Sequence, residues 1–171
     1  VIMTSADTHE GTVALLEENN YFGLNGLSIN PSAEDVASGN VNQIIILKQG
    51  MVPAVANNDA EFVTKANDPY SLQVKPHGHG DIHMLLHQVG LVSAWNKAGI
   101  DQSVFIQDTN GQVVNAILAG LEVSKEKDFD LNFLTVSRDA GEAAGSIVDM
   151  KKGDQTITMN VEYHELDPLF R

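Results

Sequence analysis

Hydrophobic residues along this chain gather in short continuous runs, which alternate with stretches where apolar positions recur every three or four residues. Residues 43–47 and 103–107 are rich in β-branched and other apolar side chains. Such unbroken runs are typical of strands that are buried on both faces of a sheet. The opening residues 1–3 and residues 131–136 predict two further strands.

Three stretches of the chain carry helix signals. Asp7 followed by Glu10 resembles a capping box and predicts that a helix begins there. A second helix is expected to begin at Asp81 and to run to about Ala98, with Gly99 as its C-terminal stop. The third helix has its apolar residues on one face: Val113, Val114, Ile117, Leu118 and Leu121.

The remaining segments complete the prediction of the fold. Residues 24–42 are rich in glycine, asparagine and serine and predict a loop insertion, and residues 54–74 predict a short hairpin. Residues 147–161 predict an antiparallel ribbon that turns at Lys152-Gly153-Asp154. Strands that alternate with helices indicate an α/β fold with a mixed, mostly parallel sheet. Both ends of the chain look cut from something larger, so we expect this sheet to be incomplete at both ends.

Composition narrows the class of protein. The chain has 171 residues, 43% of them hydrophobic, which suits one domain with a real core. Its formal net charge of -13 argues against a protein that grips a nucleic acid polymer, because neutralising phosphates needs clustered lysine and arginine. Without cysteine, disulfides and thiolate metal sites are excluded. No apolar stretch approaches the roughly 18 residues of a membrane helix and no signal peptide is visible, so we expect a cytoplasmic protein without a membrane partner.

Polar residues follow several of the predicted strands. Thr4 and Ser5 end the first strand, Gln49 comes soon after the second, and Asp108 follows the run at 103–107. In open α/β sheets, ligands bind outside the carboxyl ends of the strands. We therefore expect these side chains to line a single cleft.

Residues 75–83, Lys-Pro-His-Gly-His-Gly-Asp-Ile-His, lie just before a predicted helix and permit two ligand chemistries. The glycines allow close approach of the backbone, and a helix N-terminus suits a phosphate. Alternatively, His77, His79, Asp81 and His83 resemble the ligand run of zinc hydrolases, although Ile82 stands where that run has a histidine. A glycine loop with surface histidines would explain the same residues without any ligand.

Three side chains outside this loop also have two interpretations. Gln49 presents a paired donor and acceptor that suit a base edge, or it is an ordinary surface residue. Asp108 suits Mg²⁺ or a ribose hydroxyl, or it caps the following helix. Glu162 is an unexpected charge in the predicted ribbon, and it either faces solvent or receives the hydroxyls of a ligand.

Five motifs occur in order along the chain: Met3-Thr4-Ser5-x-x-Thr8-His9, Lys48-Gln49-x-x-Val52-Pro53-Ala54, Lys75-Pro76-His77-Gly78-His79-Gly80-Asp81-Ile82-His83, Phe105-x-Gln107-Asp108-Thr109-Asn110-Gly111 and Asn160-Val161-Glu162-Tyr163-x-x-Leu166-Asp167-Pro168. Together they resemble the UDP-sugar pyrophosphorylase family of plants and protists. The resemblance implies a Rossmann-like, GT-A-like nucleotidyltransferase core with helices on both faces of its sheet. It implies that residues 1–171 are the central part of that catalytic domain, with a C-terminal domain expected after them. It implies an enzyme that makes UDP-sugars and pyrophosphate reversibly from UTP and sugar 1-phosphates, with Mg²⁺ as cofactor and Mn²⁺ as an alternative.

The resemblance also assigns roles to individual residues of the nucleotide site. Gln49 matches the side chain that reads uracil, and Gly78 matches the glycine whose backbone faces the base. His79 matches a histidine that lines the nucleotide and sugar-phosphate pocket. Asp108 matches an aspartate that contacts ribose and metal. Asp108 and His79 are thus the expected catalytic residues, and Asp108 is the expected metal ligand.

On the sugar side, the resemblance implies a backbone contact from Gly145 and hydrogen bonds from sugar hydroxyls to Glu162. Two positions depart from the family pattern: Ser146 replaces a glycine, and His164-Glu165 replaces a pair of amides. The glycine-rich loop that holds the triphosphate is expected before residue 1, so we expect residues 1–171 alone to be inactive. A third interpretation is an inactive fragment with a structural or interaction role.

Overall fold

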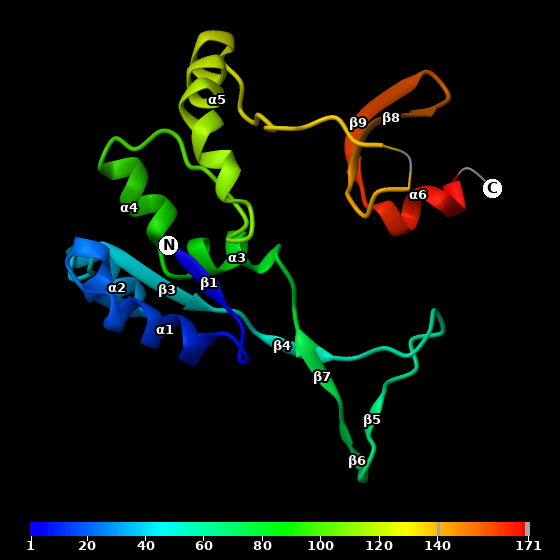
Figure 1. Cartoon of the computed structure of the whole chain (residues 1–171), viewed down its shortest axis with the longest axis horizontal. Helices are drawn as coiled ribbons and strands as arrows, with labels where there is room; N and C mark the ends of the chain where they lie inside the picture. Colours follow the sequence, from blue (N-terminus) through cyan, green and yellow to red (C-terminus); the bar gives the residue numbers. More distant parts are fainter. Residues whose placement is uncertain (140, 170–171) are drawn as a thin grey trace. The chain divides into compact units, whose positions relative to one another are not determined.

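The structure is a computed structural model that describes residues 1–139 and 141–169. It contains two compact units, Val1–Ser103 and Val104–Arg171, and each is considered by itself (Figure 1). The first unit contains a parallel sheet and the helices that cover it, and the second contains one long helix and an antiparallel ribbon.

A three-stranded parallel sheet forms the centre of the first unit. Its strands are β1 (Ile2–Thr4), β2 (Leu27–Ile29) and β3 (Ile44–Lys48), in the order β1-β3-β2. The central strand β3 has four buried residues in succession, and Ile46 and Leu47 are almost fully buried. The predicted strands at 1–3 and 43–47 are therefore confirmed.

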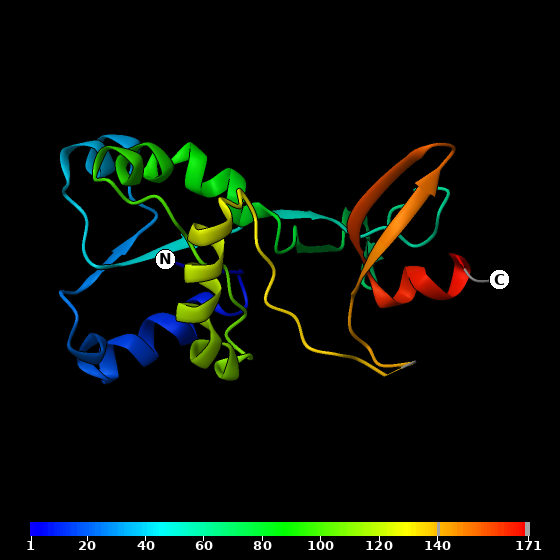
Figure 2. The ribbon, with the colours of Figure 1, turned by 90° about the horizontal axis from the view of Figure 1, so that it is seen from above.

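Helices cover both faces of this sheet, because successive side chains of β3 point to opposite sides. Ile44 and Ile46 pack with Leu16 of α1 (His9–Glu18) on one face. Ile45 and Leu47 pack on the other face with residues of three helices: Val36 of α2 (Ala33–Ser38), Leu86 of α3 (Asp81–Gln88) and Leu91 of α4 (Leu91–Lys97). Figure 2 shows α1 on one side of β3 and α3 with α4 on the other. Each such buried side chain contributes about 1.5–3 kcal/mol by leaving water.

The predicted loop insertion at 24–42 is wrong as a description of structure, since this stretch forms β2 and α2. A capping box begins α2: the Ser32 hydroxyl accepts a hydrogen bond from Asp35 N–H, and the Asp35 carboxylate accepts one from Ser32 N–H. Hydrogen bonds from Ser32 to the Asp35 carboxylate hold the pKa of Asp35 below its usual value. Whether the stretch is an insertion relative to the family stays a prediction.

Helix starts and stops differ from the prediction in two other places. The N-cap of α1 is Thr8 rather than Asp7, and its hydroxyl oxygen accepts a hydrogen bond from Ser5 N–H instead of capping the helix. The single helix expected from Asp81 to about Ala98 is two helices, because Gly90 adopts a left-handed conformation with φ of 74° between α3 and α4. Gly99, with φ of 75°, follows the end of α4 as predicted.

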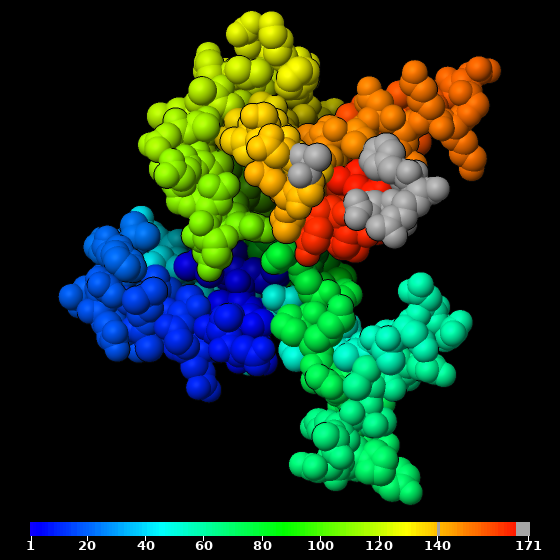
Figure 3. Space-filling view, turned by 45° about the vertical axis from the view of Figure 1, so that its right-hand side comes forward, coloured from blue at the N-terminus to red at the C-terminus, as the bar shows by residue number. Residues whose placement is uncertain are grey.

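A long β arm connects β3 to α3. β4 (Met51–Pro53) pairs with β7 (Val74–Pro76), and β5 (Thr64–Lys65) pairs with β6 (Asp68–Leu72), both antiparallel. The predicted hairpin within 54–74 is therefore confirmed. Figure 3 shows this arm extending from the rest of the first unit.

The second unit contains η2 (Gly111–Val113), α5 (Val114–Lys127), β8 (Ser146–Lys152), β9 (Gln155–Val161) and α6 (Tyr163–Leu169). The predicted helix after Asn110 and the predicted ribbon are confirmed, and the ribbon turns at Gly153 with φ of 61°. Helix α6 was not predicted. Among the described residues, none of the helices could span a lipid bilayer.

Two predicted strands are wrong, since residues 103–107 and 131–136 form no strand in the described part of the chain. Val104 is 43% exposed and Val136 is 91% exposed, so neither run is buried. A β-branched run becomes a strand only where a neighbouring strand takes up its backbone hydrogen bonds. The α/β class is confirmed, but only three strands are parallel and the described strands elsewhere pair antiparallel.

Candidate functional site

The carboxyl edge of the parallel sheet brings together three segments of the first unit. Thr4 and Ser5 are buried at the end of β1. Gln49, directly after β3, donates its backbone N–H to Thr4 O at 2.8 Å. His77 donates its backbone N–H to Gly50 O at 3.0 Å, which ties the glycine-histidine loop to the same edge. Thr4, Ser5, Gln49 and the glycine-histidine loop therefore lie together at this edge of the sheet in the first unit.

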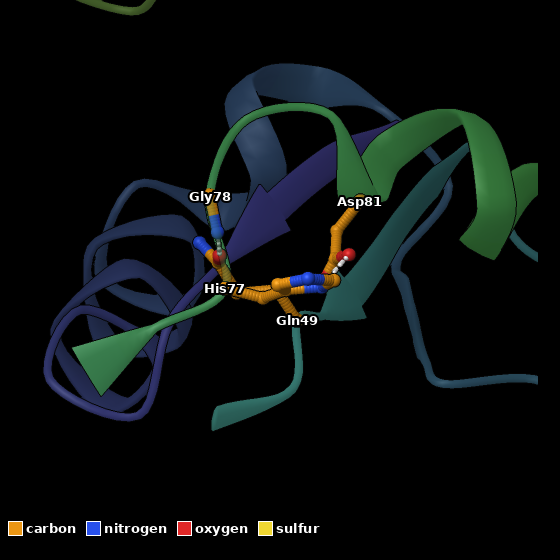
Figure 4. A network of polar contacts seen from close by, with 4 residues as sticks. All are labelled: Gln49, His77, Gly78 and Asp81. Carbon is orange, nitrogen blue, oxygen red and sulfur yellow. Dashed lines mark hydrogen bonds and ion pairs between the residues drawn. The ribbon is translucent and has the colours of Figure 1, made fainter. Parts of the chain in front are cut away.

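Gln49 and Gly78 are in direct contact. The half-buried Gln49 side chain accepts a hydrogen bond from Gly78 N–H through Oε1 at 2.8 Å (Figure 4). The two residues lie 29 positions apart in the sequence, and both were expected at the uracil site. The structure thus places a backbone donor beside a side-chain acceptor, while their contact with a base stays a prediction.

Gly78 requires glycine for a conformational reason. Its φ of 127° lies in a region that side chains with a Cβ rarely adopt. An added Cβ would meet no other atom within 4 Å, so the space on that side of the backbone is open. The Gly78 backbone therefore borders open space on the side where another residue would carry its side chain.

The rest of the loop is held by the start of α3. His77 Nδ1 contacts Asp81 Oδ1 (Figure 4), and Asp81, whose side chain is 7% exposed, donates its backbone N–H to Gly78 O at 3.1 Å. His79 lies exposed between Gly78 and Gly80. Among the residues that the structure describes, no group of three or more histidine, cysteine, aspartate or glutamate side chains could hold a metal ion. The zinc hydrolase alternative is therefore not supported.

A polar network at the end of β1 was missed by sequence reasoning. Thr4 Oγ1 lies 3.0 Å from His9 Nδ1, and Ser5 Oγ lies 3.1 Å from Thr8 Oγ1. The motif Met3-Thr4-Ser5-x-x-Thr8-His9 carried the signal, because its spacing places these side chains across the β1–α1 turn. The network fixes the start of α1 next to Gln49.

The second unit brings together both residues expected to bind sugar. An added Cβ on Gly145 would lie 2.8 Å from Asn160 Oδ1 and 3.4 Å from Glu162 Oε1. Asn160 Nδ2 donates a hydrogen bond to Glu162 Oε1 at 2.9 Å. Glu162 follows the last residue of β9 rather than lying within the strand, and it is exposed. Asn160, which sequence reasoning did not assign, orients the Glu162 carboxylate.

Asp108 lies in an exposed turn of the second unit, not at the end of a strand. Its Oδ1 accepts a hydrogen bond from Thr109 N–H at 2.8 Å, and the N-cap of η2 is Asn110. The carboxylate thus stabilises its own turn and does not cap the helix. Because Asp108 belongs to the second unit and Gln49 to the first, the single cleft that would join them stays a prediction.

Comparison with known proteins gives consistent matches. The family described as UTP–glucose-1-phosphate uridylyltransferase matches residues 1–165. The chain is 46% identical over its whole length to the UDP-sugar pyrophosphorylase of Oryza sativa subsp. japonica and 43% identical to that of Arabidopsis thaliana. It is 28% identical to the UDP-N-acetylglucosamine pyrophosphorylase of Saccharomyces cerevisiae over 85% of the chain. The chain spans about a quarter of these relatives, 26% of the plant proteins and 27% of the yeast protein. No solved structure matches it.

Proposed function

Because the chain belongs to the UTP–glucose-1-phosphate uridylyltransferase family, we propose that it supplies base and sugar contacts to an enzyme that makes UDP-sugars. The substrates would be UTP and a sugar 1-phosphate, and the products a UDP-sugar and pyrophosphate, in a reversible reaction. The observation that carries the proposal is the contact between Gln49 and Gly78, residues from distant parts of the chain. The cluster of Gly145, Asn160 and Glu162 supports it independently.

The Gln49–Gly78 contact suits the edge of uracil. Gly78 N–H is a donor and Gln49 Oε1 is an acceptor, and the distance from Gly78 N to Gln49 Oε1 is 2.8 Å. Uracil carries a carbonyl oxygen next to an N–H, so it can accept from Gly78 and donate to Gln49 Oε1 in place of their mutual bond. When the ribose holds the base in one register, cytosine presents an amino group and a bare ring nitrogen at the same two positions, which reverses the pattern. The pair therefore favours uracil over cytosine.

The proposed sugar contacts come from the second unit. A Glu162 carboxylate oxygen can accept hydrogen bonds from sugar hydroxyls, and Asn160 holds the other oxygen at 2.9 Å. Gly145 leaves room for the Asn160 amide beside this carboxylate, since a Cβ there would lie 2.8 Å from Asn160 Oδ1 and the amide would have to shift. Fixed acceptors of this kind would orient the sugar 1-phosphate for reaction.

The donor chemistry at Asp108 fits Mg²⁺. An exposed carboxylate is a hard oxygen ligand, and Mg²⁺ commonly uses one or two carboxylates together with waters and substrate phosphates. Asp108 would hold the ion, and the ion when bound would neutralise charge on the phosphate oxygens. Thr109 N–H fixes one carboxylate oxygen at 2.8 Å and so limits how the carboxylate can turn.

The proposed reaction is a single in-line displacement. A phosphate oxygen of the sugar 1-phosphate attacks the α-phosphorus of UTP, the bond from that phosphorus to the bridging oxygen breaks, and pyrophosphate leaves. The residues of this chain form no covalent bond to substrate, and their role is to hold the two substrates in line. His79, exposed on the glycine loop, is proposed to line the pocket between nucleotide and sugar phosphate. The parallel unit is proposed to be part of a Rossmann-like, GT-A-like core.

Calorimetric titration of the full-length protein with UTP and with CTP tests the base contact. We expect UTP to bind about tenfold or more tightly than CTP, since a mismatched edge leaves polar groups unpaired at about 1–3 kcal/mol each. Equal affinity for the two nucleotides would refute the assigned role of Gln49 and Gly78. Absence of any nucleotide binding by folded protein would favour the structural or interaction role instead.

A further inference from the structure

Arg138 precedes the ribbon of the second unit and makes hydrogen bonds to two later residues, Glu142 and Ser146. Its Nη1 donates a hydrogen bond to Ser146 Oγ at 2.5 Å, and its Nη2 donates one to Glu142 O at 2.7 Å. Glu142 Oε2 also accepts a hydrogen bond from Asp139 N–H at 3.0 Å. The planar guanidinium thus connects the segment to the first residue of β8 in one fixed geometry.

Arg138 is half-buried, and part of its guanidinium lacks a partner in the part of the chain that the structure describes. Its Nε is buried and makes no hydrogen bond within the described residues. The ion pairs found among those residues join His77 to Asp81 and Lys127 to Glu126, so none of them compensates the Arg138 charge. Partial burial of a charge that has no carboxylate partner lowers the stability of the fold. A role for Arg138 in holding a binding site would explain why such a charge is placed there.

The proposed sugar contacts at Gly145, Asn160 and Glu162 lie next to the Arg138–Ser146 hydrogen bond. Ser146 directly follows Gly145, and in the ribbon Ser146 lies opposite Val161, between Asn160 and Glu162. The bond from Arg138 to Ser146 therefore fixes the strand start against the two residues that face Gly145. Asn160 Oδ1 and Glu162 Oε1 are the atoms that a Cβ added to Gly145 would meet, so a shift of the Gly145 backbone toward them would disturb the Asn160–Glu162 hydrogen bond.

We propose that Arg138 is a positioning residue that acts through Ser146 to hold the Gly145 backbone against the Asn160–Glu162 pair, and so sets the affinity for the sugar 1-phosphate. The proposal rests on the proposed function, because it takes this cluster as the sugar contact. The family resemblance expects glycine at position 146, which has no hydroxyl to receive the bond from Arg138. The Arg138–Ser146 bond is then a feature that adapts the sugar pocket in this chain.

A double-mutant cycle in the full-length protein tests this link. The variants are Arg138→Met, Ser146→Gly and the two combined, with Lys151→Met as a control that removes an exposed positive charge from the same strand. We expect each single variant to raise the KM for the sugar 1-phosphate by about tenfold, since small misplacements of binding groups have effects of this order or larger. The KM for UTP should stay within about twofold, and the double variant should be no worse than the worse single one, because both changes break one link.

Several outcomes would overturn the proposal. Multiplicative effects of the two substitutions would mean that Arg138 and Ser146 act independently. Full recovery by Arg138→Lys, which keeps the charge but lacks the two-pronged geometry, would mean that charge alone matters and that Arg138 meets an anion directly. If Arg138→Met does not fold, Ser146→Gly and Arg138→Lys still decide the question. An inactive wild-type protein would sink the proposed function, whereas an active one with unchanged KM values in all variants would sink only this inference.

Discussion

Substituting leucine for Gln49 is expected to weaken UTP binding about 10- to 100-fold, because the uracil N–H loses its acceptor at a cost of about 1–3 kcal/mol. Leucine is similar in size to glutamine but has no oxygen to accept a hydrogen bond from Gly78 N–H or from a base. Because Gln49 is half-buried, water cannot fully replace the hydrogen bond that its side chain makes. Calorimetry with UTP and the KM for UTP both measure the effect.

The chain offers a matched control for this substitution. Gln43 precedes β3 as Gln49 follows it, and its Oε1 accepts a hydrogen bond from a backbone N–H, that of Asn25, at 2.8 Å. Gln43→Leu should therefore perturb a similar hydrogen bond at the other end of the strand and leave UTP binding within about twofold, as for most surface changes away from a site. A folded Gln49→Leu protein that binds UTP like the wild type would remove Gln49 from the nucleotide site.

Removing the Asp108 carboxylate should lower kcat by about a thousandfold in the full-length protein, a loss of the size seen when a group that stabilises transition-state charge is deleted. Asp108→Ala also removes the acceptor for Thr109 N–H, so its effect mixes chemistry with turn stability. Asp108→Asn keeps an oxygen for that hydrogen bond and loses only the charge. We expect both variants to lose turnover and the asparagine variant to keep the wild-type Tm. Near wild-type kcat in Asp108→Asn at saturating Mg²⁺ would reduce Asp108 to a residue that stabilises its turn.

The predicted core of the first unit followed from local sequence because its signal was unambiguous. A run such as Ile44-Ile45-Ile46-Leu47 has no polar face and is rich in β-branched residues, which favours a strand at the centre of a sheet covered on both sides. Residues 24–42 were predicted as loop from composition, although Ser32 and Asp35 already formed a capping-box pattern. Composition was the weaker guide there, since a few apolar residues such as Val36 suffice to anchor a short helix.

The runs at 103–107 and 131–136 illustrate a different limit. Their β-branched residues show a tendency to be buried, but pairing depends on which strands lie alongside, and that information is not local.

Some of the site residues could likewise be predicted from the sequence, and others could not. Gln49, Gly78, Gly145 and Glu162 follow from the family resemblance, and the structure joins them in two pairs. Asn160 and Arg138 could not be found from the chain alone, because the importance of each comes from contacts made in the folded ribbon.

Pyrophosphate release by the full-length protein tests the central claim most directly. The protein would be incubated with UTP, glucose 1-phosphate and Mg²⁺, and both pyrophosphate and the UDP-sugar would be quantified. We predict equal amounts of the two products, loss of the reaction when Mg²⁺ is withheld, and little product when CTP replaces UTP. Folded protein that releases no pyrophosphate from UTP with any of a panel of sugar 1-phosphates would contradict the account.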